Sequence, residues 1–341
     1  MTKEWSRRAA MAGLAGVVAT SARAASGAAP TPAQAAYPPS GVRSHDPAFD
    51  ALVAPDAPIT EIMSGFKATE GPCWVGGADG YLLVCDAPGN VIRRWSPHDG
   101  QSDFLSPSGY AGAPSVTIRD PGASGIIVAR GGIVLADNGN RILSRLDLRT
   151  RRMTVLARDF QGRRFNSPND MVLHPNGAIY FTDPPYGLLG TLASPARELD
   201  YMGVFRLDPD GTVSLIDRSI NIPNGIALSP DARTLYTTEQ TKGWPAIELD
   251  AAGWPVGKRM FVDTATTGFT GGDGLKVDAD GNMWTSSREG ISCFDPSGRR
   301  IGSISVGVRA ANCEIGADGY LYICATTKMM RVPVGARKLV F

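Results

Sequence analysis

One pattern recurs six times along this chain: a polar anchor residue, an apolar strand, a tight turn and a second apolar strand. The third copy shows it clearly, because Asn169 is followed by DMVLHPNGAIYFTD. The six anchors are Glu70, Ser124, Asn169, Asn224, Asp273 and Asn312. Strand pairs that repeat at intervals of about 40 to 55 residues are typical of propeller blades. The sequence therefore predicts an all-β fold, a six-bladed β-propeller.

The turns and the last copy add two expectations about this propeller. Glycine closes the turn at Gly132, Gly177 and Gly281, whereas Ala232 stands in the equivalent place in the fourth copy. The sixth copy ends after MMRVPV and is short of a strand. Residues 59–66, which precede the first anchor, are expected to join the last blade and close the ring.

Composition supports one large architecture and excludes nucleic acid as a partner. The 341 residues are 43% hydrophobic and 20% charged, enough apolar character for a sizeable core. No interior linker divides the chain. The net charge is only +1, and no basic stripe interleaves with aromatic residues, so a nucleic-acid groove is not expected.

The N-terminus carries the pattern of an export signal. Arg7 and Arg8 precede an Ala-rich apolar run, and small residues near Ala22 suit signal cleavage. Residues 1–24 resemble a twin-arginine signal, although Ala9 and Ala10 replace the usual bulky residues. The alternative is an amphipathic helix of the mature protein. The run is too short to span a bilayer, so no membrane anchoring is expected after cleavage.

Three segments follow from this organisation. Residues 1–24 are the export signal, 25–55 an Ala/Pro-rich spacer and 56–341 the catalytic propeller. Export by the twin-arginine machinery would place the protein in a bacterial periplasm. Five cysteines are present, and none forms a CxxC pair, so a zinc knuckle or thioredoxin-like site is excluded. Buried thiols are favoured, with a disulfide as the alternative.

The anchors themselves indicate a metal site. Equivalent positions on the inner strands of a propeller converge at one mouth of the central channel, which brings the carboxylates of Glu70 and Asp273 together. Two confined carboxylates repel unless a proton or a cation lies between them. Carboxylate and amide oxygens favour Ca²⁺ first, Mg²⁺ or Mn²⁺ next, and Zn²⁺ less. For any single anchor, ordinary turn chemistry is the competing interpretation.

Four segments carry a resemblance to a known family. EGPCW, RRFNSPNDMVLHPNGAIYFTDPPYG, PNGIALSPDARTLY and GGDGLKVDADGNMW resemble signature segments of the SMP-30/gluconolactonase/LRE-like family, over roughly residues 60–335. The resemblance implies a six-bladed propeller with one catalytic divalent cation, held by Glu70, Asn169, Asn224 and Asp273, and Asp273 as general base. It also implies substrate contacts at Arg164 and Asn166. RFNSPND contains two asparagines, so the second ligand aligns with Asn166 or Asn169.

A metal ion in such a channel suits hydrolysis of a lactone, a small-molecule substrate, by carbonyl polarisation and water attack. Tyr186, Ser124 and Asn312 are further candidates for substrate binding around the ring. Sugar lactones and bulkier lactones or esters both remain open. Phosphotriesterase, lyase or isomerase chemistry on the same site and a non-catalytic binding propeller are the alternatives. The sequence lacks a GxSxG elbow, and its three histidines are not at metal-site spacings.

Overall fold

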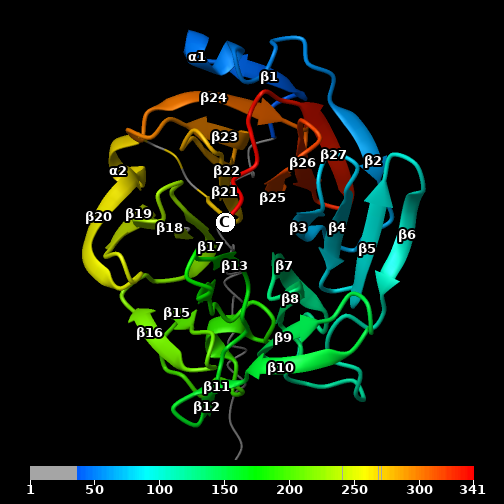
Figure 1. Ribbon diagram of the computed structural model, residues 1–341, viewed down its shortest axis with the longest axis vertical. Coiled ribbons are helices and arrows are strands. Elements are labelled where there is room, and N and C mark those ends of the chain that lie inside the picture. Colours follow the sequence, from blue (N-terminus) through cyan, green and yellow to red (C-terminus); the bar gives the residue numbers. More distant parts are fainter. Residues whose placement is uncertain (1–36, 240, 268, 270) are drawn as a thin grey trace, which may run out of the picture. The chain divides into compact units, whose positions relative to one another are not determined.

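The computed structural model describes residues 37–239, 241–267, 269 and 271–341. The predicted signal and the first part of the predicted spacer, residues 1–36, lie outside the described residues. Tyr37–Phe341 forms one compact unit in which six antiparallel sheets surround a common centre (Figure 1). The predicted six-bladed β-propeller is confirmed. Among the described residues, no helix has the length and apolar character needed to span a membrane.

The first five blades each contain four antiparallel strands in sequence order from the centre outwards, and the sixth contains three. The N-terminal region adds one strand to the fifth blade and one to the sixth. The first blade is β3 (Glu70–Val75), β4 (Tyr81–Asp86), β5 (Val91–Ser96) and β6 (Gly100–Leu105). The second is β7 (Ala123–Ala129), β8 (Gly132–Asp137), β9 (Ile142–Leu146) and β10 (Met153–Ala157). The third is β13 (Met171–Leu173), β14 (Ile179–Thr182), β15 (Val204–Leu207) and β16 (Val213–Asp217).

The second half of the ring follows the same order. The fourth blade is β17 (Pro223–Leu228), β18 (Thr234–Glu239), β19 (Gly243–Leu249) and β20 (Pro255–Asp263). The fifth is β21 (Leu275–Val277), β22 (Met283–Ser287), β23 (Gly290–Phe294) and β24 (Arg300–Ser305). The sixth is β25 (Ala310–Ile315), β26 (Tyr320–Ala325) and β27 (Lys328–Pro333). The short elements β11 (Asp159–Phe160), β12 (Arg163–Arg164), η1 (Thr191–Ala193) and α2 (Thr264–Thr267) lie in the connections.

The N-terminal segment closes the ring as expected. Strand β2 (Thr60–Met63) pairs antiparallel with β27, with Thr60 opposite Arg331 and Glu61 opposite Met330. The inner strands also contact one another in a closed order, because β25 lies against β3. The sixth blade is therefore completed by residues from the other end of the propeller.

The propeller begins before residue 56, so the boundary expected for the spacer is corrected. Strand β1 (Gly41–Ser44) adds a fifth strand to the fifth blade, with Gly41 opposite Ser305. Helix α1 (Pro47–Asp50) follows, capped by the Asp46 side chain, and buries Phe49 completely. A Cβ atom at Gly302 would lie 2.2 Å from the Phe49 ring, so glycine there allows the contact. Composition could not predict this packing, because a short segment can be anchored by very few apolar residues, here mainly Phe49.

The turns agree with the sequence except in the second blade. Gly177 and Gly281 adopt φ of 87°, and Ala232 adopts φ of 54° in the equivalent turn. In the second blade the turn is instead formed by Arg130 and Gly131, both with positive φ, and Gly132 already begins β8. Two consecutive left-handed residues match the twist of a hairpin, which explains the shorter connection.

The core consists of six apolar clusters, and each one fills the space between two neighbouring blades. One example joins Leu83 and Ile92 of the first blade to Ile126 and Leu135 of the second. Because every blade is covered on both faces, its strands are apolar on both sides rather than alternating. The five cysteines are buried free thiols, which confirms the favoured interpretation.

Candidate metal centre

The anchor residues of the six blades meet at one end of the inner strands. Ser124 Oγ donates a hydrogen bond to Asn169 Oδ1 at 2.7 Å, and Asn169 Nδ2 donates to Asn224 Oδ1 at 2.5 Å. Asp273 Oδ2 accepts a hydrogen bond from the Arg309 guanidinium. The predicted convergence of anchors from different blades is therefore present in the fold.

Glycine after an anchor lets the anchor of the next blade approach. Four of the anchors are followed directly by a glycine. A Cβ atom at any of the four would lie within 2.5 Å of the anchor residue of the next blade, which is too close for a side chain. The pairs are Gly71 with Ser124, Gly125 with Asn169, Gly225 with Asp273, and Gly274 with Asn312. The absence of a Cβ atom at these glycines therefore sets how closely the anchors approach, and so the diameter of the ring of anchors.

Hydroxyl groups on the second strands of the third, fourth and fifth blades fix the backbone of two anchors, Asn224 and Asp273. Thr182 Oγ1 donates to the carbonyl of Asn224 at 2.6 Å, and Thr238 Oγ1 donates to the carbonyl of Asp273 at 2.5 Å. Ser286 Oγ accepts the Asp273 N–H at 2.7 Å. Because the Thr182 and Thr238 bonds connect neighbouring blades and the Ser286 bond lies within the fifth blade, the backbone of Asn224 and Asp273 is held in place before any ligand binds.

Five of the six anchors, all except Asn312, border a cavity of about 240 Å³. Its polar lining comes from the first five blades and from the connections between blades. These residues are Glu70, Arg119, Asp120, Ser124, Asn138, Asn169, Tyr186, Asn224, Asp273 and Arg309. Carboxylates, amides and guanidinium groups around one small space give it the character of a binding site rather than a packing defect.

Burial and mutual repulsion raise the pKa values of the two anchor carboxylates that line this cavity. Burial raises the pKa of Glu70 well above its usual range, and the Asp273 carboxylate raises it further. Burial also raises the pKa of Asp273, although the Arg309 guanidinium opposes this effect. In turn, Asp273 raises the pKa of Arg309. The cavity therefore favours an added positive charge near Glu70 and Asp273.

The donor atoms fit a hard divalent cation. Glu70 and Asp273 offer carboxylate oxygens, and Asn169 and Asn224 offer amide oxygens. The two amides are already adjacent, because Asn169 Nδ2 donates a hydrogen bond to Asn224 Oδ1. Among the described residues, no group of three or more His, Cys, Asp or Glu side chains gathers in metal-binding positions. A set of two carboxylates and two amides lacks soft ligands, which suits Ca²⁺ or Mg²⁺ better than a thiolate-preferring ion.

Asp170, adjacent to Asn169, supports the site from behind. Its Oδ1 accepts the Met171 N–H at 2.8 Å, and its Oδ2 accepts the Ile226 N–H at 3.3 Å from the next blade. Burial raises the pKa of Asp170, and the Lys276 ammonium opposes this. Burial alone would lower the pKa of Lys276, but the carboxylates of Asp170 and Glu314 outweigh it. The Asp170–Ile226 hydrogen bond ties the third blade to the fourth, where Asn224 lies, and the charge group brings Asp170 together with Lys276 of the fifth blade and Glu314 of the sixth.

The structure brings most, but not all, of the predicted site residues to the cavity. Ser124 and Tyr186 line it, and the Asn312 amide hydrogen-bonds to Glu70 and lowers the pKa of that carboxyl. Asn169, rather than Asn166, is the asparagine that lines it.

Arg164 and Asn166 do not reach this cavity. Arg164 is exposed on β12, where its guanidinium donates to the Asn140 carbonyl at 2.9 Å. Asn166 is fully buried, and its Nδ2 donates to the carbonyls of Asp183 and Tyr201. The substrate contacts that the family resemblance implies at Arg164 and Asn166 stay a prediction.

A family model for the SMP-30/gluconolactonase/LRE-like region matches residues 68–327. The chain belongs to the SMP-30/gluconolactonase/LRE-like family. The matched range begins just before Glu70 and ends after β26, so it covers the whole ring of anchors.

Similar proteins agree with this SMP-30/gluconolactonase/LRE-like assignment. A protein of Zymomonas mobilis named gluconolactonase is 39% identical over 304 residues, 85% of each chain. Pentonolactonase XacC of Haloferax volcanii is 26% identical over 73% of this chain and 77% of its own. A solved structure described as a gluconolactonase from Xanthomonas campestris has a TM-score of 0.75 and 27% identity, covering 89% of this chain and 99% of that one.

Four cavity residues of this SMP-30/gluconolactonase/LRE-like chain were missed at the sequence level: Arg119, Asp120, Asn138 and Arg309. Asn138 follows the second strand of its blade, as Tyr186 does in the next blade, so the same topological rule would have found it. Arg309 lies three positions before the anchor Asn312. Arg119 and Asp120 belong to a long connection whose path no local pattern indicates.

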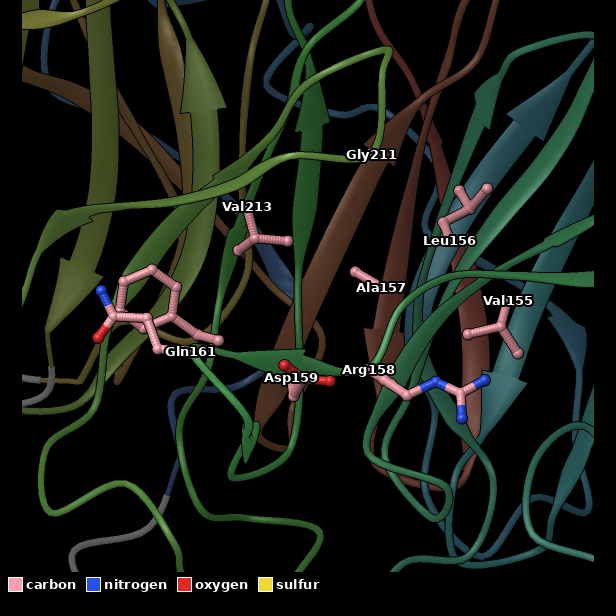
Figure 2. Close-up of a pocket in the computed structure, with 9 residues that line it drawn as sticks. Val155, Leu156, Ala157, Arg158, Asp159, Gln161, Gly211 and Val213 are labelled. Carbon is pink, nitrogen blue, oxygen red and sulfur yellow. The ribbon is translucent and has the colours of Figure 1, made fainter.

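Two larger cavities have linings that are less suited to binding a metal ion. One, of about 470 Å³, lies between the second and third blades and is lined by Val155–Gln161, Gly211 and Val213 (Figure 2). Its charged side chains are Arg158 and Asp159. The other, of about 410 Å³, is lined mainly by apolar residues at the far ends of the inner strands and by residues 338–341. Neither contains a metal-ligating group like that of the anchors.

Asp183 gives a testable link between the fold and the site. Its carboxyl oxygens accept the N–H groups of Asn166 and Ser167, both at 2.7 Å, and so shape the loop before Asn169. Burial raises the pKa of Asp183 from 3.8 to about 7. The folded protein therefore holds a proton that the unfolded chain releases, and this stabilisation is present at low pH and lost as pH rises through about 7.

We expect the free energy of unfolding of the wild type, measured relative to Asp183→Asn, to fall between about pH 5 and about pH 8. Urea unfolding of both proteins at the two pH values measures this difference. Asp183→Asn cannot titrate at this position, so it serves as the reference for all other groups. A difference that stays constant across this pH range would contradict the assignment.

Proposed function

We propose that this protein hydrolyses lactones with the help of one divalent cation. The observation that carries the proposal is the convergence of Glu70, Asn169, Asn224 and Asp273 on one small polar cavity. Similarity to a protein named gluconolactonase, at 39% identity over 85% of both chains, supports the lactone as the substrate class. The name pentonolactonase on a second relative supports the same class.

Glu70, Asn169, Asn224 and Asp273 would hold the cation. When bound, a divalent cation polarises an ester carbonyl, stabilises the developing oxyanion and lowers the pKa of water. Ca²⁺ is the proposed ion because all four side chains offer hard oxygen atoms, with Mg²⁺, Mn²⁺ and Zn²⁺ following. The raised pKa values of Glu70 and Asp273 support this, since a cavity that disfavours two negative charges gains most from a cation.

Asp273 is the proposed general base. Its carboxylate takes a proton from the attacking water and returns it to the ring oxygen as the ring C–O bond breaks, which yields a hydroxy acid. Arg309 donates to Asp273 Oδ2 and orients that carboxylate. The backbone of Asp273 is fixed at both its N–H and its carbonyl, so the group is preorganised for proton transfer.

Chelation should abolish lactone hydrolysis, and adding back a single divalent cation should restore it. Asp273→Asn should lower kcat by about 100-fold or more, because it removes both a proton acceptor and a ligand charge. Hydrolysis of a lactone panel by the purified protein, with calorimetric titration of Ca²⁺, measures both effects.

Asp280→Asn is the matched control, because Asp280 pairs with Arg337 on the surface, outside the cavity. Full turnover by Asp273→Asn, or turnover that survives chelation, would refute the mechanism. Hydrolysis of a phosphotriester with no action on any lactone would replace the proposed substrate class.

We also propose export to a bacterial periplasm by the twin-arginine route. The support is the Arg7-Arg8 pair followed by an Ala-rich apolar run. Replacing both arginines with lysine should retain the protein in the cytoplasm of an expressing bacterium, as judged by fractionation. Unchanged export of the double variant would exclude this route.

A further inference from the structure

Two polar atoms in the wall of the cavity have no hydrogen-bond partner among the described residues. They are Asn138 Oδ1 and the Tyr186 hydroxyl, and both atoms are buried. Both residues line the same cavity as the anchors, and Asn138 is only 3% exposed. A buried polar group without a partner is costly, so each of these atoms requires an explanation.

The backbone around these residues is rigidly constructed. The Gly187 carbonyl accepts the Arg119 N–H at 2.8 Å and the Asp120 N–H at 3.3 Å, and the Gly187 N–H donates to Ser167 Oγ at 2.8 Å. A Cβ atom at Gly187 would lie 2.9 Å from Asn138 Cβ, so the absence of a side chain there lets the second blade approach. Three separate parts of the chain are thus fixed around one side of the cavity.

A charged pair lies on the same side. Arg119 donates to Asp120 Oδ2 from Nε at 3.0 Å and from a terminal nitrogen at 2.8 Å. Asp120 is 7% exposed, and burial raises its pKa against the opposing effect of Arg119. Burial also raises the pKa of Tyr186 to about 12, so its hydroxyl keeps its proton and can donate.

We propose that Asn138 and Tyr186, together with the Arg119–Asp120 pair, form a subsite that binds the ring hydroxyl groups of the substrate. This proposal rests on the proposed lactonase function and specifies how the same cavity selects its lactone. The amide and the phenol hydroxyl supply a donor and an acceptor from two blades. The Arg119 guanidinium supplies a further donor and the Asp120 carboxylate a further acceptor, both from the connection before β7.

The dimensions and chemistry of the cavity favour a small polyhydroxylated lactone over an aryl-substituted one. Its volume of about 240 Å³ is below the roughly 300–1,000 Å³ typical of pockets for drug-sized ligands. A site with buried polar groups rejects an analogue that lacks the matching hydroxyl groups far more strongly than an apolar pocket could. The cavity therefore selects a hydroxylated lactone, because an apolar ring would leave Asn138 Oδ1 and the Tyr186 hydroxyl without hydrogen-bond partners.

The test compares two lactones with the same ring size: glucono-1,5-lactone, which carries ring hydroxyl groups, and δ-valerolactone, which carries none. The variants are Tyr186→Phe, Asn138→Ala and Asn138→Ser, with Tyr81→Phe as the matched control. Tyr81 lies on β4, outside the cavity. Each cavity variant should lower kcat/KM for gluconolactone by about 10-fold, mainly through KM, because it removes a hydrogen bond.

The same variants should change kcat/KM for δ-valerolactone less than about twofold, because that ring makes no such bonds. Asn138→Ser should recover part of the loss, and Tyr81→Phe should behave as wild type. Equal losses on both lactones would overturn the subsite and indicate a structural role for these residues.

A binding experiment separates this inference from the proposed function. The non-hydrolysable lactams of the two rings are titrated into wild type and variants by calorimetry in the presence of Ca²⁺. Preferential binding of the hydroxylated lactam by wild type, lost in Tyr186→Phe, supports the subsite even if no lactone is turned over. Turnover of both lactones with no difference in lactam binding would reject the subsite and leave the hydrolase intact.

Discussion

The close contact between each inner-strand glycine and the next anchor is the constraint on which the site depends. Without a Cβ atom at Gly71, Gly125, Gly225 and Gly274, neighbouring blades approach until the anchor side chains meet. The apolar clusters between blades supply the packing that draws them together. Core formation and assembly of the polar ring are therefore the same event, and stability of the ring depends on contacts outside it.

The electrostatic character of the cavity follows from that geometry. A ring narrow enough to place Asn169 against Asn224 also places Glu70 near Asp273, and burial then disfavours two negative charges. Arg309 supplies one compensating charge at Asp273, and Lys276 supplies another at Asp170 behind the ring. A divalent cation would provide the remaining compensation at the point where the proposed chemistry takes place.

The sequence predicted what repeats and missed what does not. Anchors such as Asn169 and Asp273 were identifiable because six copies present them at equivalent positions, and the closing strand β2 was identifiable because the last copy was incomplete. Arg164 and Asn166 came from the family resemblance, and they bond to Asn140 and Asp183 rather than lining the cavity. The Arg119–Asp120 pair and helix α1 depend on long-range packing that no repeat encodes.

The most direct test of this account is the position of a bound cation in crystals grown with Mn²⁺, which stands in for Ca²⁺ and gives an anomalous signal. We predict a single strong anomalous peak within coordination distance of oxygen atoms from Glu70, Asn169, Asn224 and Asp273. We also expect Arg309 to remain beside Asp273. A peak elsewhere in the propeller, or none at a concentration that supports activity, would contradict the assignment of the anchors as a metal centre.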